Sequence, residues 1–331
     1  MYDSNVSGSL KLNQIVSRAV IFGGSGFIGH HLANKLLQLG IKVTIADIQK
    51  PKSLDVDFVY CDVRNPIELG IPYDIDFVYN LAAVHRTPGH ESNEYYETNL
   101  SGAINVTEYC RRKNIKFIFF SSSIAVYGDA ENEYSETSTT SPVSHYGRSK
   151  RLAEIIHSNW VNGSEDRKLV ICRPAVIYGI GENGNFTRMA RAMRNGFFII
   201  PGSRQVIKSC GYVEDLIDSI VFIQGLDESL IYNFAFPEKY TIQDIVSDIS
   251  EISGYRMPIN LPVGSLAKFL KPMGKVSMEF ATRVEKLIKS LYVAPNVLIR
   301  KGFVWKHDLR TSLEVWHALS QFDFSQDTKM K

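Results

Sequence analysis

Apolar and polar positions alternate in blocks along the first half of the chain. Short runs rich in Val, Ile, Phe and Tyr predict strands, whereas runs in which Leu or Ile recurs every three or four residues predict helices. The strands are predicted at residues 18–24, 42–48, 58–63, 76–83, 116–123 and 169–179, and the helices at 31–40, 96–114 and 145–160. Apolar strands that alternate with helices form parallel sheets covered on both faces, so this half predicts an α/β doubly wound fold.

This rhythm breaks after about residue 180. Further helices are predicted at 185–196, 212–225 and 241–254, and a strand at 231–236 returns to the sheet. We expect three parts, which are a polar leader at 1–17, a dinucleotide-binding domain at 18–180 with return segments near 209–236, and a smaller C-terminal α/β substrate-binding lobe at 181–331.

Composition narrows the class of protein. The 331 residues are 44% hydrophobic and 22% charged, which is typical of globular domains, and the formal net charge of +2 gives no electrostatic case for nucleic acid as a partner. The four cysteines lie far apart, so they are interpreted as reduced, mostly buried thiols of a cytoplasmic protein. The spacing of His and Cys predicts no metal site, and no apolar run reaches 18 residues.

A glycine loop follows the first predicted strand and opens the first predicted helix. The stretch "GGSGFIG" places Gly23, Gly26 and Gly29 three residues apart, with Phe27 and Ile28 between the last two. Glycine lets the backbone approach a pyrophosphate closely, and the helix N-terminus offers free N–H groups and a positive dipole end. This Rossmann-like strand–turn–helix context predicts dinucleotide binding.

Two carboxylates follow later strands of the same domain. Asp47 ends the second strand, 18 residues after Gly29, where it can accept hydrogen bonds from the adenosine ribose of NAD. Lys50 and Lys52 come next and could instead attract the 2′-phosphate of NADP. Asp62 ends the third strand, either within reach of the adenine or as a turn residue.

The third predicted helix carries both a buried stripe and a candidate proton-transfer pair. Leu152, Ile155 and Ile156 are expected to form the buried stripe. Tyr146 and Lys150 are four residues apart and so share one helix face. A lysine ammonium close to a tyrosine hydroxyl favours the phenolate, which can accept a proton.

Together, these motifs resemble the extended short-chain dehydrogenase/reductases, particularly the NAD-dependent sugar epimerases and dehydratases. The likeness covers roughly residues 18–236 and rests on motifs in one order, namely "GGSGFIG" (23–29), "CDV" (61–63), "NLAA" (80–83), "SSSIAVYG" (121–128), "YGRSK" (146–150), "CRPAVIYGIGENGN" (172–185) and "GYVEDL" (211–216). The resemblance implies a catalytic triad of Ser123, Tyr146 and Lys150, and NAD as cofactor.

The resemblance also implies further contacts. Residues of its motifs are expected to contact the cofactor, namely Val63, Leu81, Ala82, Ala83 and Arg173, together with Tyr146 and Lys150. Asn99 matches an asparagine of the family, and its alternative role is to hydrogen-bond the backbone. His85 and Arg86 follow the fourth strand near the expected sugar, and a structural role for His85 is equally open.

The residues after Ser123 bear on the reaction. In the dehydratases that this group resembles, an Asp-Glu pair follows the catalytic Ser or Thr, whereas here Ile124 and Ala125 stand in those places. Apolar side chains cannot move protons, so the sequence favours a 4-epimerase that works through a 4-keto sugar. The alternatives are an NAD(P)H-dependent 4-keto-sugar-nucleotide reductase and, from another class, a non-catalytic NAD-binding regulator.

The carrier of the sugar is the least determined feature. The Arg-x-Gly-Asp-like element of many nucleotide-sugar epimerases is missing, so Arg188, Arg204 and Lys208 are the candidate diphosphate contacts, with solvated surface positions as the alternative. Asn185 is a further candidate substrate contact. The segments "LAAVHRTPGHES", "RPAVIYG" and "YVAPNVLIRKGF" resemble a bacterial branch that makes surface polysaccharide (O-antigen or capsule) and includes epimerases acting on polyprenyl-diphosphate-linked N-acetylhexosamine.

Two expectations concern partners. The basic, apolar stretch 261–291 either contacts the inner face of the plasma membrane or forms an ordinary lid on the substrate lobe. Family members commonly pair two helices in a homodimer, for which Tyr109, Cys110, Leu152 and Ile156 are candidate contacts.

The role of Asp47 gives the first testable prediction. Its carboxylate should favour free ribose hydroxyls and repel a 2′-phosphate, so the chain should bind NAD more tightly than NADP. Calorimetric titration with both dinucleotides measures this difference. Tighter binding of NADP would show that Lys50 or Lys52 dominates.

Overall fold

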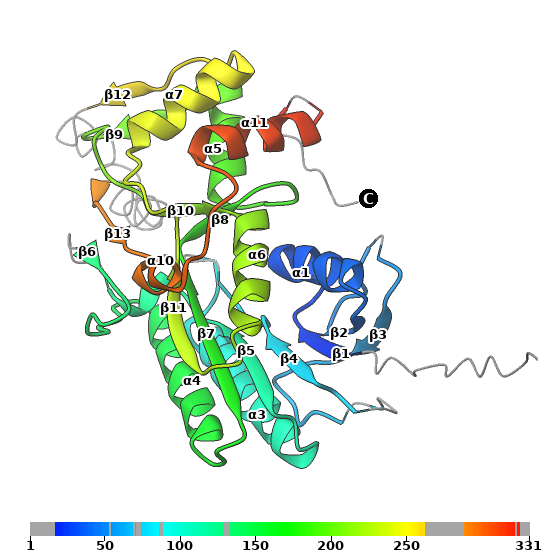
Figure 1. Ribbon diagram of the computed structural model, residues 1–331. Coiled ribbons are helices and arrows are strands. Elements are labelled where there is room, and N and C mark those ends of the chain that lie inside the picture. The colour runs from blue at the N-terminus through cyan, green and yellow to red at the C-terminus, as the bar shows by residue number, and fades with distance from the viewer. Residues whose placement is uncertain are drawn as a thin grey trace, which may run out of the picture.

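The computed structural model describes residues 17–52, 54–68, 70, 74–85, 89–128, 133–261, 288–321 and 323–324. A seven-stranded parallel sheet forms its centre, as the sequence predicted (Figure 1). The strand order is β11-β7-β5-β4-β1-β2-β3. The strands are β1 (Arg18–Phe22), β2 (Lys42–Asp47), β3 (Asp57–Tyr60), β4 (Phe77–Asn80), β5 (Phe117–Ser121), β7 (Lys168–Pro174) and β11 (Leu230–Phe234).

Helices cover both faces of this sheet. The large helices are α1 (Phe27–Gln38), α3 (Ser101–Arg112), α4 (His145–Val161) and α6 (Val213–Gln224). Side chains of α1 and α6 share a core with Ile21 and Ile45, whereas those of α3 and α4 share the opposite core with Val20 and Phe22. The fold class predicted from the sequence is therefore confirmed.

The order of strands reverses direction between β1 and β4. The chain moves outward from β1 through β2 to β3, then returns to pair β4 with the other side of β1. In doubly wound sheets, ligands bind at the carboxyl ends of the strands beside such a switch point. The loops after β1 and β4 therefore mark the place to look for the site.

The buried stripe predicted for α4 is wrong at two of its three positions. Leu152 and Ile155 are 40% and 41% exposed, and only Ile156 is half-buried. The face of α4 toward the sheet instead carries polar groups, which include Lys150 and Glu154, each at most 2% exposed. Hydropathy mispredicts the buried face of this helix because partners elsewhere in the chain stabilise the buried charges.

The residues expected at a homodimer interface divide in the same way. Tyr109 and Cys110 are 1% and 0% exposed, and Tyr109 packs edge-on against Phe22 within its own core. They are therefore core residues and not surface contacts. Leu152 on α4 and Ile104 on α3 are exposed apolar side chains, and the homodimer itself stays a prediction.

The chain leaves the central sheet at Ala175. The single strand predicted at 169–179 is two strands, since β7 lies in the main sheet whereas β8 (Val176–Tyr178) pairs with β10 (Cys210–Tyr212). Two more short parallel pairs follow, β9 (Ile199–Pro201) with β12 (Ile259–Leu261) and β6 (Glu133–Tyr134) with β13 (Tyr292–Val293).

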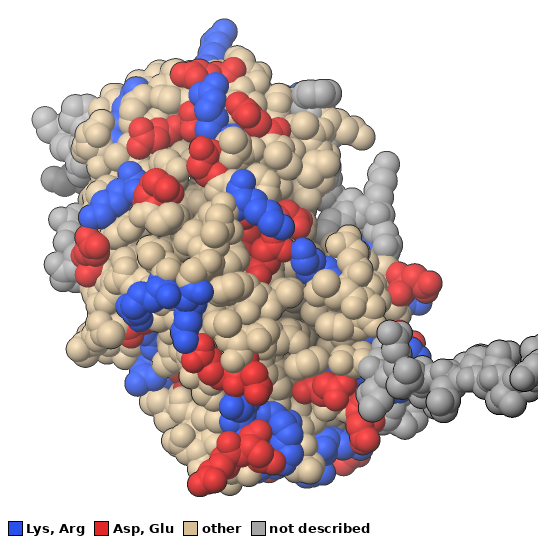
Figure 2. All heavy atoms as spheres, viewed as in Figure 1, with Lys and Arg blue, Asp and Glu red and all other residues tan. Residues whose placement is uncertain are grey.

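Helices α5 (Asn185–Arg194), α7 (Ile242–Ser253) and α11 (Leu309–Leu319) lie toward the top of Figure 1, as do strands β9 and β12. The remaining helical segments are α2 (Ser92–Tyr95), a π-helical turn (Tyr96–Leu100), a 3₁₀ turn (Ile124–Val126) and α10 (Asn296–Lys301). Lys, Arg, Asp and Glu are interspersed over the face seen in Figure 2. Within the described ranges, no helix is both long and apolar enough to cross a bilayer.

All four cysteines are buried free thiols. Burial raises the pKa of Cys61 to about 11 and that of Cys210 to about 12, so both carry their protons at neutral pH. The sequence interpretation of buried, reduced thiols agrees with this placement.

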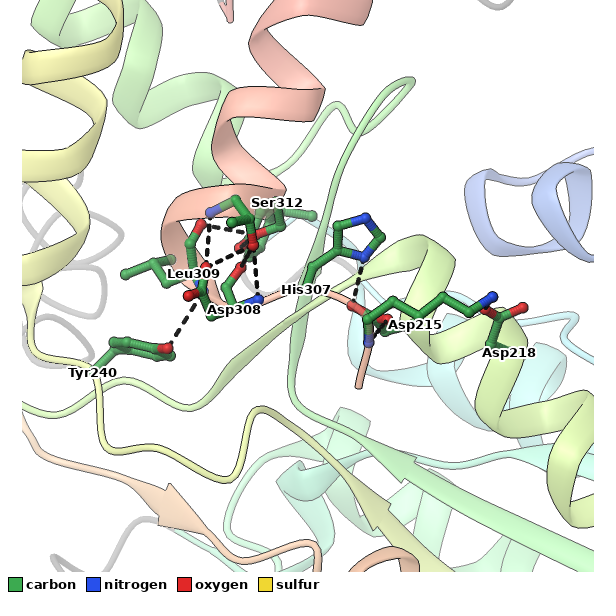
Figure 3. Close-up of polar contacts among 10 residues, drawn as sticks. Asp215, Asp218, Tyr240, His307, Asp308, Leu309 and Ser312 are labelled. Carbon is green, nitrogen blue, oxygen red and sulfur yellow. Dashed lines mark hydrogen bonds and ion pairs between the residues drawn. The ribbon is translucent and has the colours of Figure 1, made fainter. Parts of the chain in front are cut away.

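A buried carboxylate at the start of α6 binds the segment that leads into α11 (Figure 3). Asp215 is 0% exposed and accepts hydrogen bonds from the Lys306 backbone N–H at 2.9 Å and from His307 Nδ1 at 3.1 Å. The Lys306 ammonium meets Asp218, one turn further along α6, at 2.5 Å. This cluster joins the C-terminal segment to a helix of the central domain.

Removal of the Asp215 carboxylate should destabilise the fold. Asp215→Ala leaves the Lys306 N–H and His307 without their buried acceptor, so we expect a loss of about 2–3 kcal/mol in the free energy of unfolding. Denaturant titration measures the change. The matched variant Lys306→Met removes only the exposed ion pair with Asp218 and should cost less than about 1 kcal/mol. Equal losses in the two variants would contradict the proposed anchor.

Candidate active site

The structure places Ser123, Tyr146 and Lys150 together at the carboxyl edge of β5. Ser123 follows β5 and begins a 3₁₀ turn, where its Oγ accepts a hydrogen bond from Ala125 N at 3.2 Å. Tyr146 lies in the first turn of α4, whose start is capped by Ser144 Oγ. The Ser123 side chain lies close enough to the Tyr146 hydroxyl to lower the pKa of Tyr146. The expected triad therefore exists as a spatial cluster.

Lys150 is buried beneath this pair. Its Nζ donates to the carbonyl oxygen of Ser121 at 2.8 Å and lies 4.9 Å from the centre of the Phe120 ring. Burial lowers the pKa of Lys150 to about 7, and the negative charge of Glu154 partly opposes that shift. The amine is therefore poised to change its charge near neutral pH.

Tyr146 shifts in the direction opposite to the one that the sequence suggested. Burial raises the pKa of Tyr146 above its ordinary value, the hydrogen bond with Ser123 lowers it, and nearby Tyr95 raises it further. The rings of Tyr95 and Tyr146 lie 6.3 Å apart at a tilt of 56°. The protein groups alone therefore keep the Tyr146 phenol protonated, and the expected lowering does not arise from them.

Glu154 is a site residue that the sequence reasoning missed. It lies one helical turn after Lys150, is 0% exposed, and binds Arg173 through two bonds of 2.8 Å. Ser122 Oγ, next to Ser123, donates to the same carboxylate at 2.6 Å. The four-residue spacing of Tyr146, Lys150 and Glu154 along α4 was the signal that could have revealed it.

Arg173 has a structural role in this arrangement. Burial lowers the pKa of its guanidinium, but the hydrogen bonds and charge of Glu154 reverse that effect and hold the pKa above its ordinary value. A third donor, Nη1, reaches the Tyr127 hydroxyl at 3.0 Å, and that hydroxyl donates to Asn233 at 2.7 Å. The contact between Arg173 and the cofactor that the resemblance implied stays a prediction.

The backbone of the glycine loop is packed too closely for side chains at Gly23 and Gly29. A Cβ at Gly23, whose φ is +76°, would lie 2.6 Å from the backbone nitrogen of Ala82, and one at Gly29 would lie 2.6 Å from the Gly23 carbonyl oxygen. Helix α1 then starts at Phe27 with no side-chain cap and no acidic residue in its first turn. Phe27 and Ile28 thus present an N-terminus suited to a pyrophosphate.

Asp47 holds this loop from the neighbouring strand. Its two oxygens accept hydrogen bonds from the backbone nitrogens of Ser25 and Gln49, each at 3.0 Å. A carboxylate accepts about four hydrogen bonds, so capacity remains for the hydroxyls of a ribose. The loop and the ribose contact expected of Asp47 are therefore compatible.

The other expected cofactor contacts lie along the same edge. Leu81, Ala82 and Ala83 follow β4 directly and are half-buried. Asp62 forms a turn with Arg64, whose guanidinium holds the pKa of Asp62 below its usual value and pairs with it at 2.6 Å. The turn interpretation thus has direct support, whereas contact with an adenine stays a prediction.

Val63 lies deeper than its neighbours. It is 6% exposed, and a Cβ added to Gly102 on α3 would lie 2.9 Å from Val63 Cγ2. Its carbonyl oxygen accepts a hydrogen bond from Asn105 at 2.8 Å. The side chain therefore packs against α3, and its expected contact with the cofactor remains untested.

Asn99 binds backbone, which was the alternative interpretation from the sequence. Its side chain accepts from Val84 N at 2.9 Å and donates to Val84 O at 3.0 Å and Ser149 Oγ at 2.9 Å. These bonds tie the loop after β4 to α4 at Ser149, which is three residues after Tyr146 and one before Lys150. Asn99 therefore holds the site together from behind.

The candidate substrate residues do not form one cluster of contacts. His85 is exposed on the loop after β4, and Arg86 lies outside the described residues. Asn185 and Arg188 are exposed at the start of α5 and hydrogen-bond each other at 2.8 Å. The expected contacts of Asn185 with the substrate and of Arg188 with a diphosphate stay predictions.

Arg204 and Lys208 are already engaged within the second half of the chain. Arg204 donates to Gln243 at 3.1 Å and to the Pro258 carbonyl oxygen at 2.6 Å. Lys208 Nζ donates to the Lys289 carbonyl oxygen at 2.5 Å. Their observed bonds are therefore structural, and a diphosphate would have to compete with them.

Comparisons with known proteins agree with this geometry. The sequence profile described as the NAD dependent epimerase/dehydratase family matches residues 19–234. The chain is 27% identical over 310 residues to N-acetyl-alpha-D-glucosaminyl-diphospho-ditrans,octacis-undecaprenol 4-epimerase of Escherichia coli O157:H7, which covers 89% of this chain and 92% of that protein.

Two solved structures illustrate the similarity in fold. A UDP-glucuronic acid 4-epimerase from Bacillus cereus in complex with NAD superimposes with a TM-score of 0.75 at 20% identity, covering 92% of this chain and 100% of that one. A UDP-N-acetylglucosamine 4-epimerase from Bacillus cereus gives a TM-score of 0.72 at 19% identity, with 92% and 96% covered.

Substitution of Lys150 tests whether its buried charge lowers the stability of the fold. Below a pKa of about 7 the folded wild type bears the cost of a buried charge, so Lys150→Met should melt at a higher temperature than wild type at pH 6. Between about 7 and 10.5 the unfolded wild type binds more protons than the folded one, so its stability rises with pH and the advantage of the variant shrinks. Calorimetry at pH 6 and pH 9 measures both effects. A melting-temperature gain of the variant over wild type that is smaller at pH 6 than at pH 9 would refute the buried charge.

Proposed function

Because the chain belongs to the NAD-dependent epimerase/dehydratase family, we propose that it is a sugar 4-epimerase. Its substrate would be a hexose or N-acetylhexosamine on a nucleotide or polyprenyl diphosphate, inverted through a transient 4-keto sugar during the synthesis of surface polysaccharide. The observation that carries this proposal is the Ser123–Tyr146–Lys150 cluster, which holds a proton-transfer group and its partners but no second acid–base pair.

The residues after Ser123 support epimerisation over dehydration. Ile124 is 8% exposed and packs with Val126, Tyr127 and Val293 in a small apolar core. Gly147 lies so close to the Ala125 carbonyl oxygen that a Cβ there would lie 2.4 Å from it. Neither Ile124 nor Ala125 offers a titratable group, and loss of water across two carbons needs one to remove and one to deliver a proton.

The roles of the chain's own groups follow from their positions. When bound, NAD supplies the hydride acceptor and donor and a positive charge that favours the Tyr146 phenolate. Tyr146 Oη then accepts the proton of the sugar 4-hydroxyl and later returns it, while Ser123 holds the reacting oxygens by hydrogen bonding. Lys150 favours the phenolate when it is charged, and Glu154 supports that charge.

The similarity to the undecaprenol-linked 4-epimerase favours a polyprenyl carrier. A lipid carrier would place the enzyme in the cytoplasm, peripheral to the inner face of the plasma membrane.

Incubation with UDP-linked and polyprenyl-diphosphate-linked N-acetylglucosamine tests the reaction, with the product configuration at C4 followed by NMR. A 4-epimerase should work without added cofactor beyond the NAD it holds. Stoichiometric consumption of NAD(P)H with a keto sugar would instead identify a 4-ketoreductase.

Replacement of the proton-transfer group is the matching test of the site. Tyr146→Phe keeps the ring but removes the hydroxyl, so turnover should fall by about 10²–10⁴ while NAD affinity is mostly kept. Tyr95→Phe changes a neighbouring hydroxyl and serves as the control. Turnover near the wild-type rate in Tyr146→Phe would reject the assigned role.

A further inference from the structure

Strands β9 and β12, together with the residues just before them, carry four exposed apolar side chains. Ile199 lies opposite Ile259 in the parallel register, and side chains at paired positions point to the same face of a sheet. Ile199 is 41% exposed and Ile259 is 61% exposed. Two residues before Ile199 and Ile259 lie Phe197 and Met257, which are 82% and 41% exposed. We name these four side chains the β9–β12 face.

The other side of the sheet is covered at β9. Ile200 is 1% exposed and belongs to the main core, whereas its partner Asn260 on β12 is exposed. Ile199 and Ile259 therefore lie next to each other on a side of the sheet that is both apolar and exposed. A cluster of exposed apolar side chains is typical of an interaction surface.

Arginines border the β9–β12 face where its strands begin. Arg191 and Arg194 are exposed in the last turn of α5, just before Phe197, and Arg256 is exposed just before Met257. A Cβ added to Gly196 would lie 3.7 Å from Arg256 Cδ, so the two strand entries lie side by side. Arg194 pairs with Asp323 at 2.5 Å, which partly offsets this positive charge.

The sequence continues this chemistry beyond β12. Residues 262–287, which directly follow Leu261, contain four lysines and one arginine against two glutamates, with Leu, Phe, Met and Val between them. Apolar side chains flanked by basic ones are drawn to the headgroup region of anionic bilayers, where they insert without crossing. A bilayer therefore matches the apolar character and the charge of this surface together.

We propose that the β9–β12 face docks the protein on an anionic membrane surface. The proposal deepens the proposed function, since a polyprenyl-linked sugar lies in the bilayer and the enzyme must come to it. The four apolar side chains insert at the headgroup level, and Arg191, Arg194 and Arg256 meet lipid phosphates.

Co-sedimentation of the full-length chain with vesicles tests the docking without any substrate. The vesicles contain phosphatidylglycerol and phosphatidylcholine or phosphatidylcholine alone, at low and high salt. We expect binding to the anionic vesicles at low salt, and Phe197→Ser combined with Ile259→Ser should lower the partition coefficient by roughly tenfold or more. Val304→Ser, which removes a 77% exposed side chain between α10 and α11, is the matched control and should bind like wild type.

The arginines are tested separately. Arg256→Gln should lower binding by roughly fivefold, because one basic side chain near an anionic surface contributes about that factor. Arg300→Gln on α10 removes an equally exposed arginine elsewhere and should leave binding unchanged. Circular dichroism confirms that each variant is folded, and the single variant Phe197→Ser replaces the double one if that fails.

Two results would overturn the proposal. One is equal binding of the Phe197→Ser and Val304→Ser variants to anionic vesicles. The other is self-association in light scattering that the double variant abolishes while lipid binding is absent, which would identify a second copy of the chain as the occupant. Vesicle binding that follows the face, without turnover of either sugar carrier, would reject the proposed function and leave the docking intact.

Discussion

The carboxylate of Glu154 is the buried group on which the geometry of the site depends. It accepts hydrogen bonds from Ser122 at the end of β5 and from Arg173 on β7, and it lies one turn from Lys150 on α4. A buried ion pair adds little net stability, but the loss of one partner costs about 3–5 kcal/mol because the other charge stays buried. The position of Ser123 and the charge of Lys150 are therefore both constrained by one fully buried side chain.

The same interaction explains what hydropathy could and could not predict. Continuous apolar strands predicted the central sheet and its helices, because most of its strands are buried on both faces, the edge strand β3 excepted. Along α4 the rule fails, since Lys150 and Glu154 turn inward while Leu152 and Ile155 remain exposed. Their partners Ser122 and Arg173 lie 32 and 19 residues from Glu154, too far for a local pattern to reveal.

The second half was harder to predict for a different physical reason. Strands β8, β9, β10 and β12 have three residues each and exist only because of partners far along the chain, such as Ile199 opposite Ile259. The glycine loop, by contrast, was predictable because its steric demand is local, as the close approach of Gly29 to Gly23 shows. Substrate residues chosen for charge alone, including Arg204, proved to be engaged with the protein itself.

We infer that burial, partly opposed by the negative charge of Glu154, brings the pKa of Lys150 close to neutral pH. Titration of protein labelled with ¹³Cε-lysine, followed by NMR and assigned with Lys150→Met, measures that charge directly. The account predicts a half-point near 7 for Lys150 in the wild type and a lower one in Glu154→Gln, because the lost negative charge no longer supports the ammonium. A half-point close to the ordinary lysine value of about 10.4, unchanged in Glu154→Gln, would contradict it.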